Sequence, residues 1–290
     1  MPILRRVRVR ARSTLEGVKV SLGPIQQTSL IPLYGRALDA RKKRPISADP
    51  WAARIVDQLD WDFARLDGSH ALTGSPIRSV VFDELVRRSL PDDGPVTVVD
   101  LGVGLNTRAQ RMNLPDRVRF VEVDLPDVIG VRRQVLPASP NRELCEGSML
   151  DEPWMHRVAS RGGRFVLVAE AVFMYFDESD VHDSFARLAR AFPGAPLVFD
   201  TFGQRMLDRQ DRDKALAQMQ ARLRWACEDV HVVERWGGYR VEHTRPMLDL
   251  DDVAKGRVPL ARRLGLRAFV TLMPKLAGSY RIHRVRMPAR

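Results

Sequence analysis

Residues 97–110 read TVVDLGVGLNTRAQ. The stretch begins with branched apolar residues that favour a buried β-strand, continues through Asp100, Gly102 and Gly104, and then becomes compatible with a helix. Glycines placed directly after a strand allow the backbone to approach a ligand closely. The stretch therefore predicts a ligand-binding loop between a strand and a helix.

This loop lacks the residues that phosphate-binding loops need. A dinucleotide-binding loop has a third glycine, which lets the helix pack tightly while its N-terminus meets a pyrophosphate. Thr107 stands in that place, and no Gly-Lys-Ser/Thr sequence of a Walker-type loop follows. Asp100 adds negative charge near the loop, which suits a cationic or hydroxyl-rich ligand better than a phosphate.

A second acid, Asp124, lies 22 residues after Gly102, at the end of the apolar run RFVEVD. An acid there can accept hydrogen bonds from both hydroxyls of an adenosine ribose, or it can cap the helix that begins at Leu125 and Pro126. S-adenosylmethionine offers a ribose, an adenine and a cationic sulfonium without any phosphate. The residues favour a methyltransferase over two alternatives, a nicotinamide dehydrogenase and a structural glycine turn without catalysis.

Apolar runs alternate with helical patterns through the middle of the chain. Such runs predict the strands of a parallel sheet covered by helices on both faces, which is an α/β fold. Helical spacing also precedes residue 96, with a helix entry at Asp49-Pro50, and we expect a long helix over 204–228. The imperfect alternation of GSYRIHRVRM, from residue 278, predicts an added edge strand. The four apolar runs are VTVVDLG from residue 96, RVRFVEVDLP from 117, RFVLVAE from 164 and APLVFDTFG from 195.

The net charge of +11 belongs to the two ends of the chain. Fifteen of the 47 Lys and Arg residues lie in 1–12 and 255–290, which contain no acid, and the 36 acidic residues outnumber the bases that remain. We interpret the basic ends as solvated; contact with RNA or an anionic membrane is the alternative. No nucleic-acid partner is therefore expected.

The number of cysteines and the length of the apolar runs indicate the cellular compartment. Cys145 and Cys227 are the only cysteines, so no disulfide framework or Cys-based zinc site is expected. No apolar run approaches the roughly 20 residues of a membrane span, and the start of the chain does not read as a secretory signal. These features predict a reduced, cytoplasmic protein.

Four motifs in order, VVDLGVGLNTR, VEVDLPDVI, GSMLDEPWM and VAEAVFMYF, resemble the leucine carboxyl methyltransferase superfamily, in particular its branch around the tetracenomycin polyketide O-methyltransferase. LIPLYGRAL, DPWA and PIRSVVFDE also match, so the resemblance spans roughly residues 18–290. Val103 and Asn106 stand where the family usually has a small residue and an acid.

The resemblance implies a Rossmann-like, seven-stranded S-adenosylmethionine-dependent methyltransferase sheet with a helical N-terminal extension and a helical insertion. It implies methyl transfer to a carboxylate or hydroxyl of a small molecule, with a polyketide-like acceptor as one candidate. We expect a basic flexible arm, residues 1–17, and one domain over 18–290. The parts of that domain would be a helical part (18–95), a cofactor-binding core (96–202), a substrate cap (203–245) and a C-terminal part (246–290).

Within that resemblance, Arg78 would bind the carboxylate at the methionyl end of the cofactor, although by itself it reads as a surface residue of an amphipathic helix. Asp124 would hold the ribose, and Glu170 would lie beneath the methionyl part or the sulfonium, although it too can be read as a helix cap. The residues expected to bind the cofactor are Arg36, Arg78, Asp100, Gly102, Gly104, Asp124, Leu125, Ser148, Met149, Leu150, Glu170 and Tyr175.

Catalysis of methyl transfer depends mainly on positioning. A carboxylate acceptor is ionised at neutral pH and needs no general base, whereas a phenol would benefit from one. His70, expected in a loop, and Tyr175 are weak catalytic candidates, and no metal site is expected. The lack of a convincing base favours a carboxylate slightly.

The insertion at 203–245 also contains Trp225, Trp236 and Tyr239, which could wall an aromatic acceptor; core packing explains them equally well. A non-catalytic S-adenosylmethionine-binding domain and an NAD(P)-dependent oxidoreductase remain the alternative functions. The sequence does not determine the oligomeric state.

Overall fold

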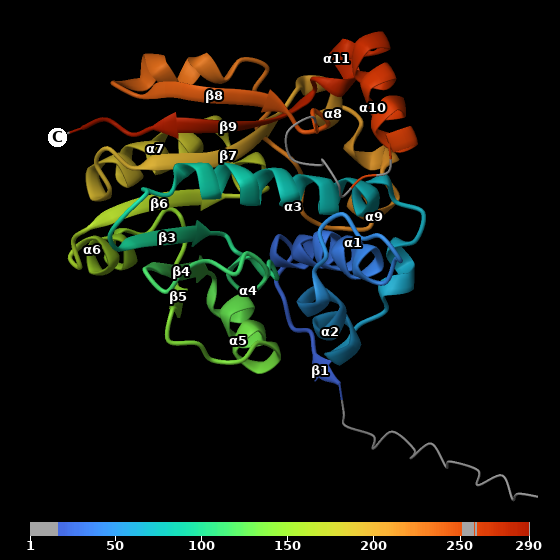
Figure 1. The fold of residues 1–290 in the computed structure, drawn as a ribbon, viewed down its shortest axis with the longest axis horizontal. Coiled ribbons are helices and arrows are strands. Elements are labelled where there is room, and N and C mark those ends of the chain that lie inside the picture. Colours follow the sequence, from blue (N-terminus) through green and yellow to red (C-terminus); the bar gives the residue numbers. More distant parts are fainter. Residues whose placement is uncertain (1–16, 251–257, 259, 290) are drawn as a thin grey trace, which may run out of the picture.

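The computed structural model describes residues 17–250, 258 and 260–289. Apart from Gly17, the predicted N-terminal arm lies outside the described residues. The centre of the fold is a seven-stranded sheet in the order β5-β4-β3-β6-β7-β9-β8 (Figure 1). Neighbouring strands from β5 to β7 are parallel, and β9 runs antiparallel to both β7 and β8. The strands are β3 (Val96–Leu101), β4 (Val118–Asp124), β5 (Arg142–Glu146), β6 (Arg164–Ala169), β7 (Pro196–Phe202), β8 (Arg240–Pro246) and β9 (Tyr280–Arg286).

The four strands predicted from apolar runs are confirmed as β3, β4, β6 and β7. The expected C-terminal strand is present as β9, but the prediction that it forms an edge is wrong, because β8 pairs with its other side. His283 is fully buried there, and its ring nitrogens lie 2.9 Å from the Thr201 hydroxyl and 2.8 Å from the Thr244 hydroxyl. Arg284, which interrupts the apolar face of Ile282, lies 3.1 Å from Glu242 of the neighbouring strand β8, so polar residues of this interior strand have partners on its neighbours.

Side chains alternate between the two faces of the sheet, and helices cover both. Val98, Val166 and Val198 pack with residues of α3 (His70–Ser89), whereas their neighbours Val99 and Leu167 pack with α6 and α7 on the other face. These buried strands confirm the prediction of a parallel sheet between two helical layers. The covering helices of the second layer are α6 (Glu152–Ala159) and α7 (Glu178–Ala191).

The N-terminal helices lie beyond the carboxyl ends of the central strands (Figure 1). α1 (Leu30–Ala40) and α2 (Pro50–Gln58) share an apolar cluster with α5 (Pro126–Val135). The predicted helix entry is confirmed, because the Asp49 side chain accepts a hydrogen bond from the Ala52 amide at 3.0 Å. This helical extension therefore forms one wall of the space above the sheet. The short elements nearby are β1 (Val18–Lys19), β2 (Leu59–Asp60), η1 (Gln26–Ser29), η2 (Phe63–Leu66) and α4 (Arg108–Arg111).

The prediction of one long helix over 204–228 is wrong. The chain forms only single turns there, because Asp213 starts a new helix by accepting from the amides of Ala215 and Leu216 and also holds Ser69 of the N-terminal part. Residues 218–228 then run without helix. The turns are α8 (Gln204–Leu207), η4 (Gln210–Arg212) and α9 (Lys214–Ala217).

The remaining described elements are η3 (Phe173–Tyr175), η5 (Val230–Trp236), α10 (Leu260–Leu272) and α11 (Pro274–Ala277). Within the described ranges, no helix has the length and apolar character that crossing a membrane requires.

Candidate active site

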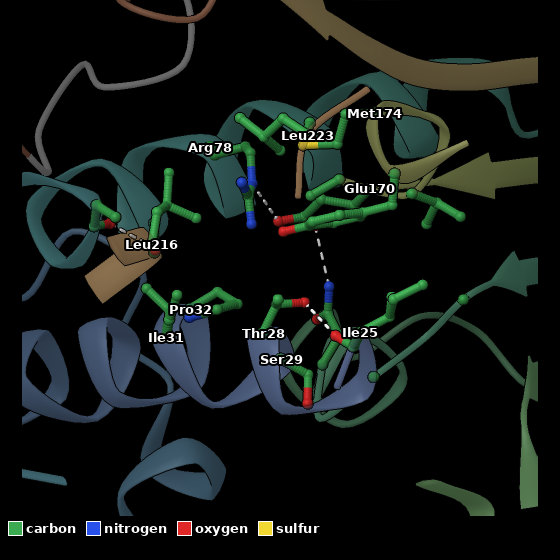
Figure 2. Close-up of a pocket in the computed structure, with 18 of the residues that line it drawn as sticks. Ile25, Thr28, Ser29, Ile31, Pro32, Arg78, Glu170, Met174, Leu216 and Leu223 are labelled. Carbon is green, nitrogen blue, oxygen red and sulfur yellow. Dashed lines mark hydrogen bonds and ion pairs between the residues drawn. The ribbon is translucent and has the colours of Figure 1, made fainter. Parts of the chain in front are cut away.

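A cavity of about 620 Å³ lies at the carboxyl ends of β3, β4 and β6. Its walls come from the loops after these strands, from η1 and α1, from α3, and from the segment after β7. Figure 2 shows Arg78 and Glu170 on one side of this space and Thr28 and Ser29 on the other. The position agrees with the rule that open α/β sheets bind ligands outside the carboxyl ends of their strands.

The glycine loop after β3 forms the floor of this cavity. Gly102 and Gly104 have φ angles of +56° and +51°, which L side chains rarely adopt. A Cβ on Gly102 would lie 2.8 Å from Val172 Cγ2, and one on Gly104 would lie 2.8 Å from Ser29 Cβ. Both glycines are thus required by the backbone turn and by contact with the cavity walls.

Asp124 ties this loop to the end of β4. Its carboxylate accepts hydrogen bonds from the Gly104 amide at 2.6 Å and from the Leu125 amide at 2.8 Å. Burial raises the pKa of Asp124, while these two amides lower it. Leu125, not Asp124, occupies the N-cap position of α5, so the helix-capping interpretation of Asp124 is wrong. Asp124 instead lines the cavity.

Glu170, just after β6, accepts three hydrogen bonds. One oxygen accepts from Arg78 Nε at 2.8 Å, and the other accepts from Arg108 Nη2 at 2.5 Å and from Asn106 Nδ2 at 3.0 Å. Burial alone would raise the pKa of Glu170, but Arg78 and Arg108 outweigh it and lower the pKa to about 2. The cavity therefore contains a carboxylate that stays ionised.

Asp100 does not line the cavity, so the prediction that it contacts the cofactor is not retained. It lies 2.5 Å from Nη1 of Arg108, a guanidinium that is completely buried and also binds Asp83 at 3.2 Å. Burial raises the pKa of Asp100 to about 6, although Arg108 lowers it. Asp100 thus compensates the arginine that orients Glu170.

Arg78 lies in α3 and is only 14% exposed, because Glu170 and Tyr280 bind it. Its Nη1 donates to the Tyr280 hydroxyl at 3.2 Å, and that hydroxyl donates to Asp200 on β7. Burial raises the pKa of Asp200 to about 6, although Arg78 lowers it. Asp200 also accepts from the Ala171 amide at 2.8 Å.

Sequence reasoning missed Tyr280 and Asp200. The available signals were an acid near the end of the apolar run APLVFD and a tyrosine at the start of the last strand, neither of which is specific.

Arg36 lines the cavity from α1 while remaining buried. Its guanidinium donates to Asp49 at 2.9 Å and to the Leu105 carbonyl at 2.9 Å. Thr107, in the place of a third glycine, donates to the same Asp49 at 2.5 Å. Burial lowers the pKa of Arg36, while Asp49 raises it. Arg36 and Arg78 are therefore two fixed cations of the cavity wall.

The other predicted residues are placed as follows. Leu125, Ser148, Met149, Tyr175 and His70 line the cavity, whereas Leu150 does not and is not retained. His70 is the first residue of α3, so its placement in a loop is wrong; Ser69 caps that helix. Burial raises the pKa of Tyr175.

Two roles were open for the aromatic residues of the insertion, a wall for the acceptor and core packing, and the structure shows core packing. Trp225 and Tyr239 are buried in the apolar core beside β7, Trp236 packs against that core, and none of the three lines the cavity. In the part of the chain that the structure describes, no group of three or more His, Cys, Asp or Glu residues could hold a metal ion.

The cavity wall combines two kinds of side chain. Arg36, Arg78, Asp124 and Glu170 bring fixed charges of both signs, which suit a ligand that carries both charges and hydroxyls. The apolar side chains of the wall suit a hydrophobic molecule. Figure 2 shows several of them around Arg78 and Glu170. They are Ile25, Ile31, Pro32, Met174, Leu216 and Leu223.

Comparison with known proteins gives a consistent result. Residues 29–189 match the family described as leucine carboxyl methyltransferase. The tetracenomycin polyketide synthesis O-methyltransferase TcmP of Streptomyces glaucescens is 29% identical over 92% of this chain and 98% of its own length. The S-adenosyl-L-methionine-dependent methyltransferase dpfgK of Gibberella zeae is 27% identical over 77% of this chain and 82% of its own length.

Among solved structures, the [4+2]-cyclase SpnF aligns with a TM-score of 0.50 at 16% identity, covering 94% of this chain and 99% of that chain. This likeness concerns the fold alone.

Proposed function

Because the chain belongs to the leucine carboxyl methyltransferase family, we propose that it methylates an oxygen of an apolar, polyketide-like small molecule at the cavity above the sheet. The protein is an S-adenosylmethionine-dependent methyltransferase, as its relatives are. The observation that carries the proposal is the cavity itself, whose wall combines fixed charges of both signs with apolar side chains.

The charged residues of the cavity fit S-adenosylmethionine. We propose that Arg78 and Arg36 bind its carboxylate, since guanidinium groups suit carboxylates. Asp124 is already oriented by the Gly104 amide, and we propose that it holds the ribose. Ser148 with its neighbours would flank the adenine. The neighbours that line the cavity are Met149 and Leu125.

When bound, the cofactor supplies an activated methyl group on a sulfonium. The task of the chain is to hold the acceptor oxygen in line with that group and to exclude water. Glu170 stays ionised because of its arginine partners, so it can stabilise a neighbouring positive charge. Met174 and Leu223 give the acceptor an apolar surface. Tyr175 lines the cavity near them and is proposed to contact the reacting region.

Of the ionisable side chains that line the cavity, His70 stays a weak candidate for a general base. Glu170 has a low pKa and three donors, so it does not accept a proton at neutral pH. This favours an acceptor oxygen that is ionised before it reacts, with a carboxylate as the first candidate. We further propose that residues 18–290 form one domain in which the cap predicted over 203–245 covers the acceptor with its first part, residues 203–223.

The test is a thermal-shift series with S-adenosylmethionine, S-adenosylhomocysteine and NADH. The first two should stabilise the protein by about 2.7 kcal/mol at a hundredfold excess over Kd, and NADH should not. Stabilisation by NADH alone would favour an oxidoreductase. Cofactor binding without methylation of any aromatic acid or phenol would favour a non-catalytic binding domain.

A further inference from the structure

Two arginines line the cavity beside its apolar side chains. Arg205 and Arg209 belong to the segment that follows β7, and they line the cavity together with Met206 of the same segment. Both side chains are exposed, so neither is held by the protein core. The wall next to the proposed acceptor is thus apolar in its body and cationic in two places.

Neither guanidinium has a partner within the described residues, whereas Arg36 and Arg78, which line the same cavity, are each paired with a carboxylate. Asp213, an acid of the cavity wall, accepts hydrogen bonds from Ser69 at 2.8 Å and from the Ala215 amide at 3.0 Å.

The acids of the same segment are used in a similar way. Asp208 accepts from Gln204 Nε2 at 2.8 Å, and Asp211 lies 3.3 Å from Arg222. Two guanidinium groups without an ion-pair partner in the described part of the chain therefore place free N–H donors beside apolar side chains of the cavity. Guanidinium groups bind carboxylates and other oxyanions by paired N–H donors.

We propose that the methyl acceptor carries an anionic group, separate from the oxygen that is methylated, and that Arg205 and Arg209 bind this group. The apolar body of the acceptor then lies between Met174, Leu216 and Leu223. An oxygen that two guanidinium groups hold offers fewer lone pairs for attack, so the bound anion is not the reacting atom. This inference rests on the proposed function, because it assigns a role to two further side chains of the same cavity.

The experiment compares two probes of the same shape that both keep one carboxylate for the reacting site. The naphthoate probe is a naphthalenedicarboxylate, and the naphthamide probe is its monoamide. Each is titrated by fluorescence into the full chain saturated with S-adenosylhomocysteine, which prevents turnover. The wild type should bind the naphthoate about fivefold more tightly, as expected for two exposed ion pairs. The double variant Arg205→Gln/Arg209→Gln should lose this preference while binding the naphthamide as before.

Arg212→Gln is the matched control, because Arg212 is an exposed arginine of the same segment that does not line the cavity. It should keep the preference, and raising the salt concentration should weaken the preference in the wild type. Equal binding of both probes, no binding of the naphthoate, or a preference that survives in the double variant would overturn the inference while leaving the proposed function intact. If S-adenosylhomocysteine itself fails to stabilise the wild type, the proposed function fails, and this inference fails with it.

Discussion

Arg78 owes its position to residues that are far away in the sequence. Glu170 binds its Nε, and Tyr280 accepts from its Nη1 while donating to Asp200. A guanidinium fixed on two sides loses little freedom when it binds a carboxylate, which favours binding. Tyr280 is therefore a positioning residue, because it acts through Arg78.

We expect Tyr280→Phe to weaken S-adenosylhomocysteine binding about fivefold, because one hydrogen bond that orients Arg78 is lost. Isothermal titration calorimetry measures this change. Tyr239→Phe is the control, since Tyr239 is buried in the core outside the cavity. Equal affinities for Tyr280→Phe and the wild type would mean that Glu170 alone orients Arg78.

At the scale of elements, the loop between β3 and α4 decides the shape of the cavity floor. Gly102 and Gly104 of this loop adopt left-handed backbone angles, and the Asp124 carboxylate at the end of β4 accepts a hydrogen bond from the Gly104 amide. The loop also contacts η1, because Ser29 lies against Gly104. The strand-loop-helix unit and the N-terminal extension therefore fit together only when position 104 has no side chain.

Gly104→Ala should destabilise the fold by about 2 kcal/mol, from the strained φ and the contact with Ser29. Urea unfolding measures this loss. The matched control is Gly130→Ala in α5, where a Cβ meets nothing within 4 Å and helix propensity improves, so its stability should be equal or higher by up to about 1 kcal/mol. Equal stability of the two variants would contradict the role assigned to Gly104.

At the scale of the whole molecule, buried charges couple stability to pH. The folded pKa of Glu170 is about 2, below its ordinary value of 4.5, because Arg78 and Arg108 outweigh the effect of burial. A carboxyl group with a lowered pKa stabilises the folded state at pH values above 4.5, and this contribution disappears as the pH falls towards 2.

Glu170→Gln should therefore destabilise the protein by about 3 kcal/mol at pH 7, a value that follows from the lowered pKa. The difference between variant and wild type should shrink as the pH falls below about 4.5. Urea unfolding of both proteins at a series of pH values measures the difference and cancels the titration of groups that do not interact with Glu170. A difference that does not depend on pH would mean that Glu170 is not held ionised by its arginines.

Several features followed from the sequence alone. Continuous apolar runs predicted four strands, because a parallel sheet covered on both faces needs apolar side chains on both sides. Gly102, Gly104 and Asp124 were found because turn geometry and strand ends leave a local signal. Arg78 was identified only through the resemblance to a family, since its partners have no local signal.

Other features were decided only by the tertiary structure. The edge position of β8, the short turns over 204–217 and the burial of Trp225 depend on which segments pack together. Asp100 and Glu170 are both acids of apolar runs, yet only Glu170 lines the cavity. Arg108 binds both carboxylates. Local sequence determines which residues can form a strand, a turn or a cap, whereas the partners of a buried charge are brought together by chain folding across many residues.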